Sequence, residues 1–249
     1  MAITSSHNQR LKEIRKLRMR RREREKSGRF VAEGEDLLAA ADAAGWRPVE
    51  RFCAAGSGLA GVEVEPKVLA SASGLASGTR ALAVYEERWA PTPVGPLCVY
   101  LHGMSDPGNV GAVLRSAEAF GASCVAIGPG SADPFGPKAV RASMGAVFTV
   151  PLARASTLEQ LPGTKVALVP GAGRPLPGLL GSDSTPRAQN PTVRETTLLI
   201  GAEREGLPSE LIEQADHAAH VPTKTHSLNA AMAATIALYE ATRMAPERA

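Results

Sequence analysis

The chain has 249 residues, of which 44% are hydrophobic and 21% charged, as in a folded globular protein with one large or two modest domains. Its three cysteines, Cys53, Cys98 and Cys124, are odd in number, widely spaced and without a Cys-x-x-Cys, so they indicate neither a disulfide framework nor a structural zinc site and fit a reducing cytoplasm. We expect neither a metal centre nor a membrane, because the most apolar helical stretch, residues 228–241, is too short to span a bilayer.

The net charge of +3 conceals a strong asymmetry along the chain. Residues 1–30 contain eleven Lys and Arg against three Glu, a net charge of +8, whereas the remainder carries −5. Such a basic arm is typical of proteins that bind a phosphate backbone, and a solvated helical tail is the alternative. No aromatic residue interrupts residues 10–26, so we expect backbone contacts rather than base stacking. The candidate phosphate contacts are Arg10, Lys12, Arg15, Lys16 and Arg18.

The first predicted domain is a small α/β unit. After the basic arm come a short apolar piece at residues 30–34 and a helix at residues 35–44 that ends at Gly45. Further apolar pieces follow at residues 49–54 and 62–64, and residues 81–85 are typical of a strand. Residues 90–96 are rich in proline, as in a linker. We therefore predict domains at residues 1–92 and 93–249.

The second predicted domain contains a series of continuous apolar runs, at residues 97–101, 124–127, 146–150, 166–169, 197–200 and 218–221. Continuous rather than alternating runs predict strands that are buried on both faces, and hence a parallel sheet covered by helices. Residues 171–191 are rich in Gly, Pro and Ser, which predicts a loop. The fold class is therefore α/β.

The segment at residues 105–122 predicts a tight loop and a helix after the run at 97–101. A Pro-Gly turn precedes Asn109, which is expected as the helix N-cap, and Gly121 is expected to end the helix. The apolar positions form one stripe, and Arg115 projects from the other side of the helix, above Gly111. Asn, Gly and Arg are expected to meet at the carboxyl end of a strand, where open α/β sheets bind ligands, and an ordinary solvated arginine on a strand-helix unit is the alternative.

Two further polar segments follow strands of the same domain. Residues 198–208 combine a strand with a glycine-containing loop that carries Glu203. Residues 221–229 precede an apolar helix that continues through Tyr239, and Ser227 or Asn229 is a plausible N-cap for it. Each segment alone is weak support for a site.

Together, in this order and spacing, the three segments resemble the SpoU/TrmH family of SPOUT RNA 2′-O-ribose methyltransferases. Asn109-x-Gly111-x-x-x-Arg115 resembles the first motif of the family, Gly201-x-Glu203-x-x-Gly206 the second, and residues 227–229 the third. Residues 140–148 resemble its middle segment, and the N-terminal unit is similar to the substrate-binding domain often fused ahead of the catalytic domain. The resemblance spans nearly the whole chain.

The resemblance implies a parallel sheet with a C-terminal trefoil knot, S-adenosyl-L-methionine as the cofactor, and a homodimer that completes the active site. By position it places the cofactor against Val169, Pro170, Gly171, Ile200, Gly201, Ala202, Glu203, Gly206, Val221, Pro222 and Leu228. It also implies an RNA substrate, for which Arg141 joins the contacts on the basic arm. The resemblance implies the catalytic residues Arg115, Asn109, Glu203, Ser227 and Asn229.

Methyl transfer to a ribose 2′-hydroxyl requires positioning of the acceptor and removal of its proton. A guanidinium keeps its proton near neutral pH, so we expect Arg115 to clamp the acceptor and to favour the developing alkoxide. Asn109 would orient Arg115 or the ribose, Glu203 would order its loop or the arginine, and Ser227 and Asn229 would hold the cofactor loop and the polar network.

The chain departs from the family pattern at two places. Ala202 replaces an asparagine that is often found there, and residues 223–226 replace a stretch that commonly carries methionine, glycine and an acidic residue. His226 is a chemically better base than an arginine near pH 7, which gives the hypothesis that it assists proton removal or contacts RNA phosphate. An exposed loop histidine without a role is the alternative.

The sequence leaves several functions open. Ribosomal RNA is favoured over transfer RNA because of the auxiliary domain and the basic arm, and housekeeping modification is not separated from antibiotic resistance. A transfer RNA 2′-O-methyltransferase and a non-catalytic RNA-binding protein are the alternatives, although a degenerate site would have lost some of the motif residues. A Rossmann dehydrogenase is excluded because no Gly-x-Gly-x-x-Gly joins the first strand and helix of the second domain.

Overall fold

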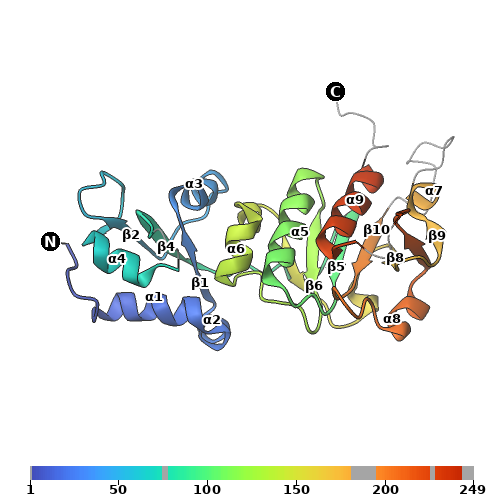
Figure 1. Cartoon of the computed structure of the whole chain (residues 1–249), viewed down its shortest axis with the longest axis horizontal. Helices are drawn as coiled ribbons and strands as arrows, with labels where there is room; N and C mark the ends of the chain where they lie inside the picture. The colour runs from blue at the N-terminus through green and yellow to red at the C-terminus, as the bar shows by residue number, and fades with distance from the viewer. Residues whose placement is uncertain (1, 75–77, 181–194, 225–227, 243–249) are drawn as a thin grey trace, which may run out of the picture. The chain divides into compact units, whose positions relative to one another are not determined.

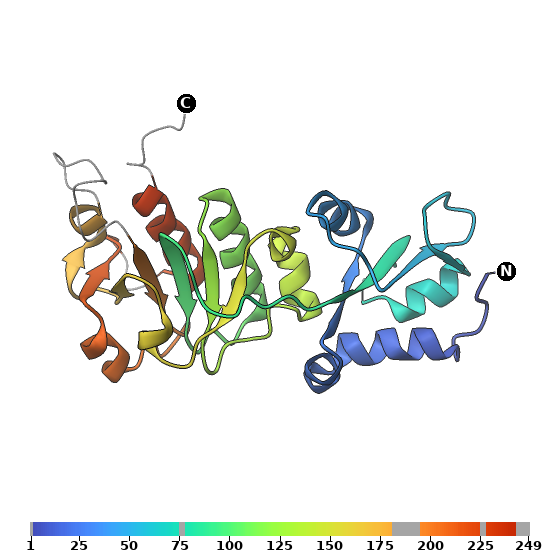
Figure 2. The same ribbon diagram turned by 180° about the vertical axis from the view of Figure 1, so that it is seen from behind.

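The computed structural model describes residues 2–74, 78–180, 195–224 and 228–242. The chain forms two compact units (Figures 1 and 2): the first comprises Met1–Arg88 and Asp133–Thr149, the second Trp89–Ala132 and Val150–Ala249. The division after Arg88 lies close to the predicted boundary at residue 92. The return of residues 133–149 to the first unit is a feature that a single boundary does not describe.

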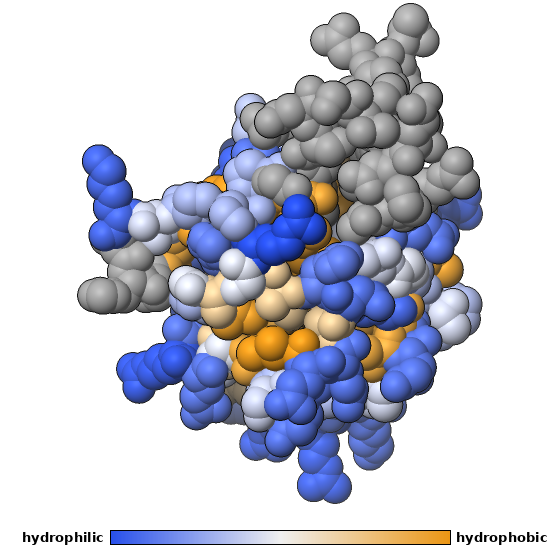
Figure 3. Space-filling view, turned by 90° about the vertical axis from the view of Figure 1, so that its right-hand side faces the viewer, coloured by the Kyte–Doolittle hydropathy of each residue, from blue (hydrophilic) through white to orange (hydrophobic). Residues whose placement is uncertain are grey.

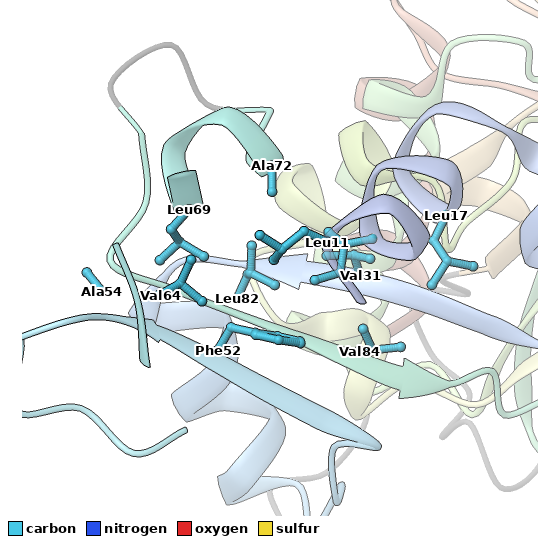
Figure 4. Close-up of a cluster of buried hydrophobic side chains, with 11 residues drawn as sticks. Leu11, Leu17, Val31, Phe52, Ala54, Val64, Leu69, Ala72, Leu82 and Val84 are labelled. Carbon is cyan, nitrogen blue, oxygen red and sulfur yellow. The ribbon is translucent and has the colours of Figure 1, made fainter. Parts of the chain in front are cut away.

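The first unit is built on a four-stranded sheet in the order β1 (Arg29–Glu33), β4 (Ala81–Glu86), β2 (Glu50–Ala54) and β3 (Val62–Val64). Strand β4 is antiparallel to both neighbours, and β3 is parallel to β2. Helices α1 (Gln9–Met19) and α4 (Pro66–Ala72) bury their apolar side chains against one face of this sheet (Figure 4). Helix α3 (Glu35–Ala43) also contacts β1 and β4.

The basic N-terminal segment is part of this unit rather than an extended arm or a solvated tail. Leu11, Ile14 and Leu17 recur every three residues in α1 and are all buried in the core. A second short helix, α2 (Arg21–Ser27), follows and contributes the buried Arg24. The prediction of an arm was wrong because it weighed the charges and overlooked the apolar stripe between them.

A cluster of aromatic rings holds residues 133–149 in the first unit. Phe30 lies 4.7 Å from Phe135, and Phe148 lies 5.2 Å from both Trp46 and Tyr85 (ring centroids). The segment contains α6 (Pro137–Ser143) and a 3₁₀ helix, Ala146–Phe148. The strand predicted at residues 146–150 was therefore wrong, because this apolar run is buried by aromatic contacts instead of sheet pairing.

The second unit is built on a seven-stranded parallel sheet in the order β7-β6-β5-β10-β8-β11-β9. Its strands are β5 (Leu97–Leu101), β6 (Cys124–Ile127), β7 (Leu152–Arg154), β8 (Thr164–Leu168), β9 (Arg174–Pro175), β10 (Thr196–Ile200) and β11 (His217–His220). Five of the six predicted runs are confirmed as strands of this sheet. The two short strands β7 and β9 were not predicted.

Helices cover the parallel sheet. Helices α5 (Pro107–Ala119) and α9 (Ala230–Thr242) pack side by side, as both views show (Figures 1 and 2). Helix α8 (Ser209–Gln214) adds Leu211 and Ile212 to a second cluster of apolar side chains, which includes Tyr100 and Leu199. The end of this unit beside β9 and α8 carries an apolar area bordered by polar side chains (Figure 3).

The loop predicted at residues 171–191 is in part ordered structure. It begins with β9 and α7 (Leu176–Leu180), and residues 181–194 lie outside the described part of the chain. None of the described helices has the length and apolarity required to cross a membrane.

Candidate active site

Helix α5 begins earlier than the sequence predicts. Asp106 is the N-cap: its carboxylate accepts a hydrogen bond from the backbone N–H of Gly108 at 2.7 Å, and Pro107 occupies the first helical position. Asn109 is therefore not the cap but a residue of the first turn. Its side-chain amide is consequently free of capping and points to partners from other segments.

Three side chains from the three motifs form one hydrogen-bonded chain. Asn109 Nδ2 donates to Glu203 Oε1 at 2.9 Å, and Asn229 Nδ2 donates to Asn109 Oδ1 at 3.2 Å. Asn229 also caps α9, as expected, since its Oδ1 accepts from the N–H groups of Ala231 and Met232 at 2.9 and 3.2 Å. The two roles are compatible because capping uses the amide oxygen and the network uses the amide nitrogen.

Glu203 lies at the tip of a tight turn after β10. The backbone groups of Ala202 and Gly206 exchange two hydrogen bonds, of 3.0 and 3.1 Å, which close the turn. Burial raises the pKa of Glu203, but hydrogen bonds from Asn109 and from the N–H groups of residues 105 and 106 outweigh it, and the pKa lies below its ordinary value. Glu203 is thus held as a carboxylate that ties this turn to the start of α5.

Gly201 marks a close approach of two backbone segments in the same turn. A Cβ on Gly201 would overlap the backbone of Gly206 and Leu207. A larger residue would therefore push the Glu203 turn away from β10.

A cavity of ≈ 180 Å³ lies beside this turn, at the carboxyl ends of β8, β10 and β11. Of the predicted cofactor residues, all except Pro222 line it: Val169, Pro170, Gly171, Ile200, Gly201, Ala202, Glu203, Gly206, Val221 and Leu228. Prediction missed the other lining residues, Leu168, Arg204, His220, Thr223, Ala230 and Ala233. Most of them adjoin named positions, so reading the strand ends as a set would have found them.

The remaining predicted catalytic residues are placed apart from the network or are not described. Arg115 is exposed on α5, and within the described ranges it makes no hydrogen bond to Asn109 or Glu203. Ser227, together with His226, lies outside the described residues. The structure thus brings together Asn109, Glu203 and Asn229, and Arg115 lies outside their hydrogen-bonded network.

The predicted phosphate contacts fall into two groups. Arg10 pairs with Glu50 at 2.7 Å, Arg15 donates to the backbone oxygen of Ser6 at 2.7 Å, and Arg18 pairs with the buried Glu33. Lys12 and Lys16 are exposed on α1, and Arg141 is half-buried in the last turn of α6. The arginines of α1 are therefore engaged within the fold, and its lysines face solvent.

A family model described as the SpoU rRNA methylase family matches residues 96–239, which include the cavity and the three motifs. The chain belongs to this family. A second model, the MRM3-like substrate binding domain, matches residues 8–88. The resemblance to SpoU/TrmH proteins that the motifs indicated is confirmed.

Two relatives of this SpoU family member are named as ribosomal RNA 2′-O-methyltransferases. It is 27% identical over 259 residues, covering 95% of this chain and 97% of the relative, to the 23S rRNA (guanosine(2553)-2′-O)-methyltransferase RlmP of Bacillus subtilis. It is 36% identical over 147 residues to the 23S rRNA (uridine(2479)-2′-O)-methyltransferase of Streptomyces viridochromogenes, covering 56% of this chain and half of that relative.

Solved structures of the family resemble the whole chain. An AdoMet-bound rRNA methyltransferase from Sinorhizobium meliloti superposes with a TM-score of 0.83 at 29% identity, covering 98% of this chain and 97% of that one. The SpoU methyltransferase AviRb from Streptomyces viridochromogenes, in complex with AdoMet, gives 0.80 at 26% identity, covering 95% and 98%. The α/β fold with a parallel sheet is therefore that of SpoU methyltransferases.

Proposed function

We propose that this protein transfers a methyl group from S-adenosyl-L-methionine to the ribose 2′-hydroxyl of a nucleotide in ribosomal RNA. The observation that carries the proposal is the Asn109–Glu203–Asn229 network, which joins three separate motifs at the edge of one cavity. The Bacillus and Streptomyces relatives, named as 23S rRNA 2′-O-methyltransferases, support the same activity and substrate.

The cavity suits a nucleoside cofactor. Apolar side chains such as Val169, Ile200 and Leu228 offer contact to a flat ring, and Gly171 and Gly201 leave main chain open to approach. We infer that these residues hold S-adenosyl-L-methionine, which supplies an electrophilic methyl group when bound. Glu203 keeps the surrounding turn in place through Asn109.

Arg115 acts on the acceptor side in this proposal. Its guanidinium carries a fixed positive charge and several N–H donors, which suits a ribose-phosphate and a hydroxyl that gains negative charge as its proton leaves. Arg115 projects from the same helix that carries Asn109, six residues further along. We infer that the helix positions both, with Asn109 fixed by Glu203 and Arg115 available to substrate.

The first unit supplies RNA contacts through the exposed lysines of α1. Because Arg10 and Arg18 are paired with Glu50 and Glu33, we assign phosphate binding to Lys12 and Lys16, with Arg141 on α6 as a further contact. Removing both lysine charges is expected to lower the slope of log Kd against log salt by about one to two. Arg10→Ala is the matched control, since its charge is already balanced within the fold.

We infer two further family properties from the sheet and its helices. Strand β10 lies between β5 and β8, although both precede it in the chain, and α9 then returns to pack against α5 and β10. This order supports a trefoil knot in the C-terminal part. Exposed Met232 and Tyr239 on α9 support a homodimer that meets through this helix. A ribosomal RNA substrate also supports a cytoplasmic location.

The proposal is tested by measuring cofactor binding and by identifying the methylated RNA. Calorimetric titration is expected to show S-adenosyl-L-methionine binding, and ribosomal RNA from host cells with and without the gene is expected to differ at one 2′-O-methylated nucleotide. A difference in transfer RNA instead would assign the alternative substrate. Failure to bind the cofactor would favour a non-catalytic RNA-binding protein.

A further inference from the structure

One residue of the first unit has a backbone conformation that its side chain disfavours. Met144, directly after α6, has φ 52° and ψ 31°, in the left-handed region. Among the described residues it is the only non-glycine with positive φ, whereas sixteen glycines occupy such positions. Elsewhere, therefore, the chain places glycine where this conformation is needed, because a Cβ is strained there.

Packing of the side chain does not compensate this strain. Met144 is 57% exposed, although Ser143 before it and Gly145 and Ala146 after it are buried. A glycine would close the same turn without strain, as it does in most helix C-caps of this type. The methionine side chain is therefore not explained by the fold of the turn. Strained positions of this kind are a reason to look for function.

The turn that carries Met144 is fixed rigidly to the first unit. A Cβ on Gly145 would lie 2.7 Å from the Cβ of Ala40 in α3, so the backbone is packed closely there. Phe148 N–H donates to the Gly145 carbonyl at 2.9 Å, and Trp46 Nε1 donates to the Phe148 carbonyl at 2.7 Å. The backbone of Met144 is consequently anchored beside these contacts, so a partner would meet its side chain at a fixed point of the surface.

Two cations accompany this methionine. Lys138 and Arg141 are three residues apart on α6, so they share one face of the helix that ends at Met144. An exposed apolar side chain three to six residues from positive charges matches an unpaired nucleotide, whose base has an apolar face and whose phosphates are negative. A protein interface fits less well because lysine, unlike methionine and arginine, is depleted at the centres of such interfaces.

We propose that Met144 is an RNA contact on which an unpaired base of the substrate packs, while Arg141 and Lys138 bind the neighbouring phosphates. The inference rests on the proposed function for the identity of the partner. It adds a base-contacting residue to a first unit that otherwise binds RNA through charge. It also explains why a strained methionine occupies a position suited to glycine.

Three substitutions at this position separate strain from contact. Met144→Gly relieves the strain and removes the side chain, Met144→Asn keeps a residue that tolerates this conformation but is polar, and Met144→Leu keeps apolar bulk. Each is compared with the wild type and with Val49→Ala, another exposed apolar side chain of the same unit. The measurements are Tm, Kd for deproteinised ribosomal RNA at several salt concentrations, and methyl transfer to that RNA.

We expect Met144→Gly to have an equal or higher Tm and an RNA Kd weakened about tenfold, a loss in the range of one base contact. Met144→Asn is expected to weaken binding similarly, whereas Met144→Leu and Val49→Ala stay within about twofold of the wild type. The salt slope is expected to stay unchanged in all three Met144 variants and to fall by about one in Arg141→Ala.

Several results would overturn the inference. Unchanged RNA affinity in Met144→Gly and Met144→Asn would show that the side chain makes no contact. A lower Tm in both variants would assign Met144 a structural role, and a change of oligomeric state in size-exclusion chromatography would assign it to a second copy of the chain. If the wild-type protein bound RNA but neither bound S-adenosyl-L-methionine nor methylated the RNA, the proposed function would fail. The RNA Kd values of the Met144 variants would still show whether the Met144 side chain contacts RNA.

Discussion

Substitution of Asn109 by aspartate changes one NH₂ group to oxygen and so tests the polar network with almost no change in size. In the structure Asn109 Nδ2 donates to Glu203 Oε1 at 2.9 Å. An introduced carboxylate would place two negative charges at that distance. Their repulsion is about 1.4 kcal/mol at the dielectric constant of water and about 6 kcal/mol at an effective constant of about 20.

Glu203 is only partly buried, so the lower value sets the minimum effect. Since 1.4 kcal/mol corresponds to a factor of about ten, we expect Asn109→Asp to weaken S-adenosyl-L-methionine binding at least tenfold at pH 8. The physical reason is that repulsion moves the Glu203 turn, which lines the cavity. Calorimetric titration measures this directly.

The pH dependence distinguishes repulsion from simple loss of a hydrogen bond. Two adjacent carboxyl groups raise the pKa of one of them, and the protonated group can donate to the other. Affinity in Asn109→Asp is therefore expected to recover as the pH falls from 8 towards 5.5. Asn109→Ala lacks the repulsion and should show no such recovery. Equal affinities in the two variants across this range would refute the electrostatic account of the network.

Three further predictions concern single residues. Arg24→Met is expected to lower the free energy of unfolding by about 3–5 kcal/mol in urea titration, because it leaves the largely buried carboxylate of Asp133 without its ion-pair partner at 2.7 Å. By contrast, Arg21→Met, in an exposed pair with Glu25, should cost less than about 0.5 kcal/mol. Gly201→Ala is expected to abolish cofactor binding in calorimetry while circular dichroism stays unchanged, since a Cβ there overlaps the next turn; retained binding would show that the turn adapts. Arg115→Ala is expected to reduce methyl transfer about a hundredfold or more with an unchanged cofactor Kd, and a parallel loss of cofactor affinity would contradict its placement on the acceptor side.

The sequence predicted the sheet of the second unit well because buried parallel strands are continuous apolar runs. The same pattern wrongly predicted a strand at residues 146–150, where the apolar run is buried among aromatic rings. Short strands such as β7 and β9 carry too few residues for a pattern to be seen. Apolar runs therefore indicate burial, and the partner that buries them is a property of the folded chain.

For the site, sequence reasoning found the residues but not their bonds. It predicted Asn109 as a helix cap because Asn is favoured there, and it overlooked Asp106 before Pro107, which performs that task. Likewise, the charge count of the first thirty residues did not show that Arg10, Arg18 and Arg24 have acidic partners from distant segments. Ion pairs and hydrogen bonds between residues far apart in the sequence become visible only in the folded structure, whereas motif residues can be found in the sequence itself.

The membership of residues 133–149 in the first unit has a consequence for synthesis of the chain. Phe30 and Tyr85 are made early, but their ring partners Phe135 and Phe148 leave the ribosome only after β5, α5 and β6 of the second unit. The first unit therefore cannot complete its core during synthesis before part of the second unit has been made. A fragment that begins at residue 93 would retain both phenylalanines without the rings that cover them, so exchange of the first unit between relatives requires that two stretches of sequence move together.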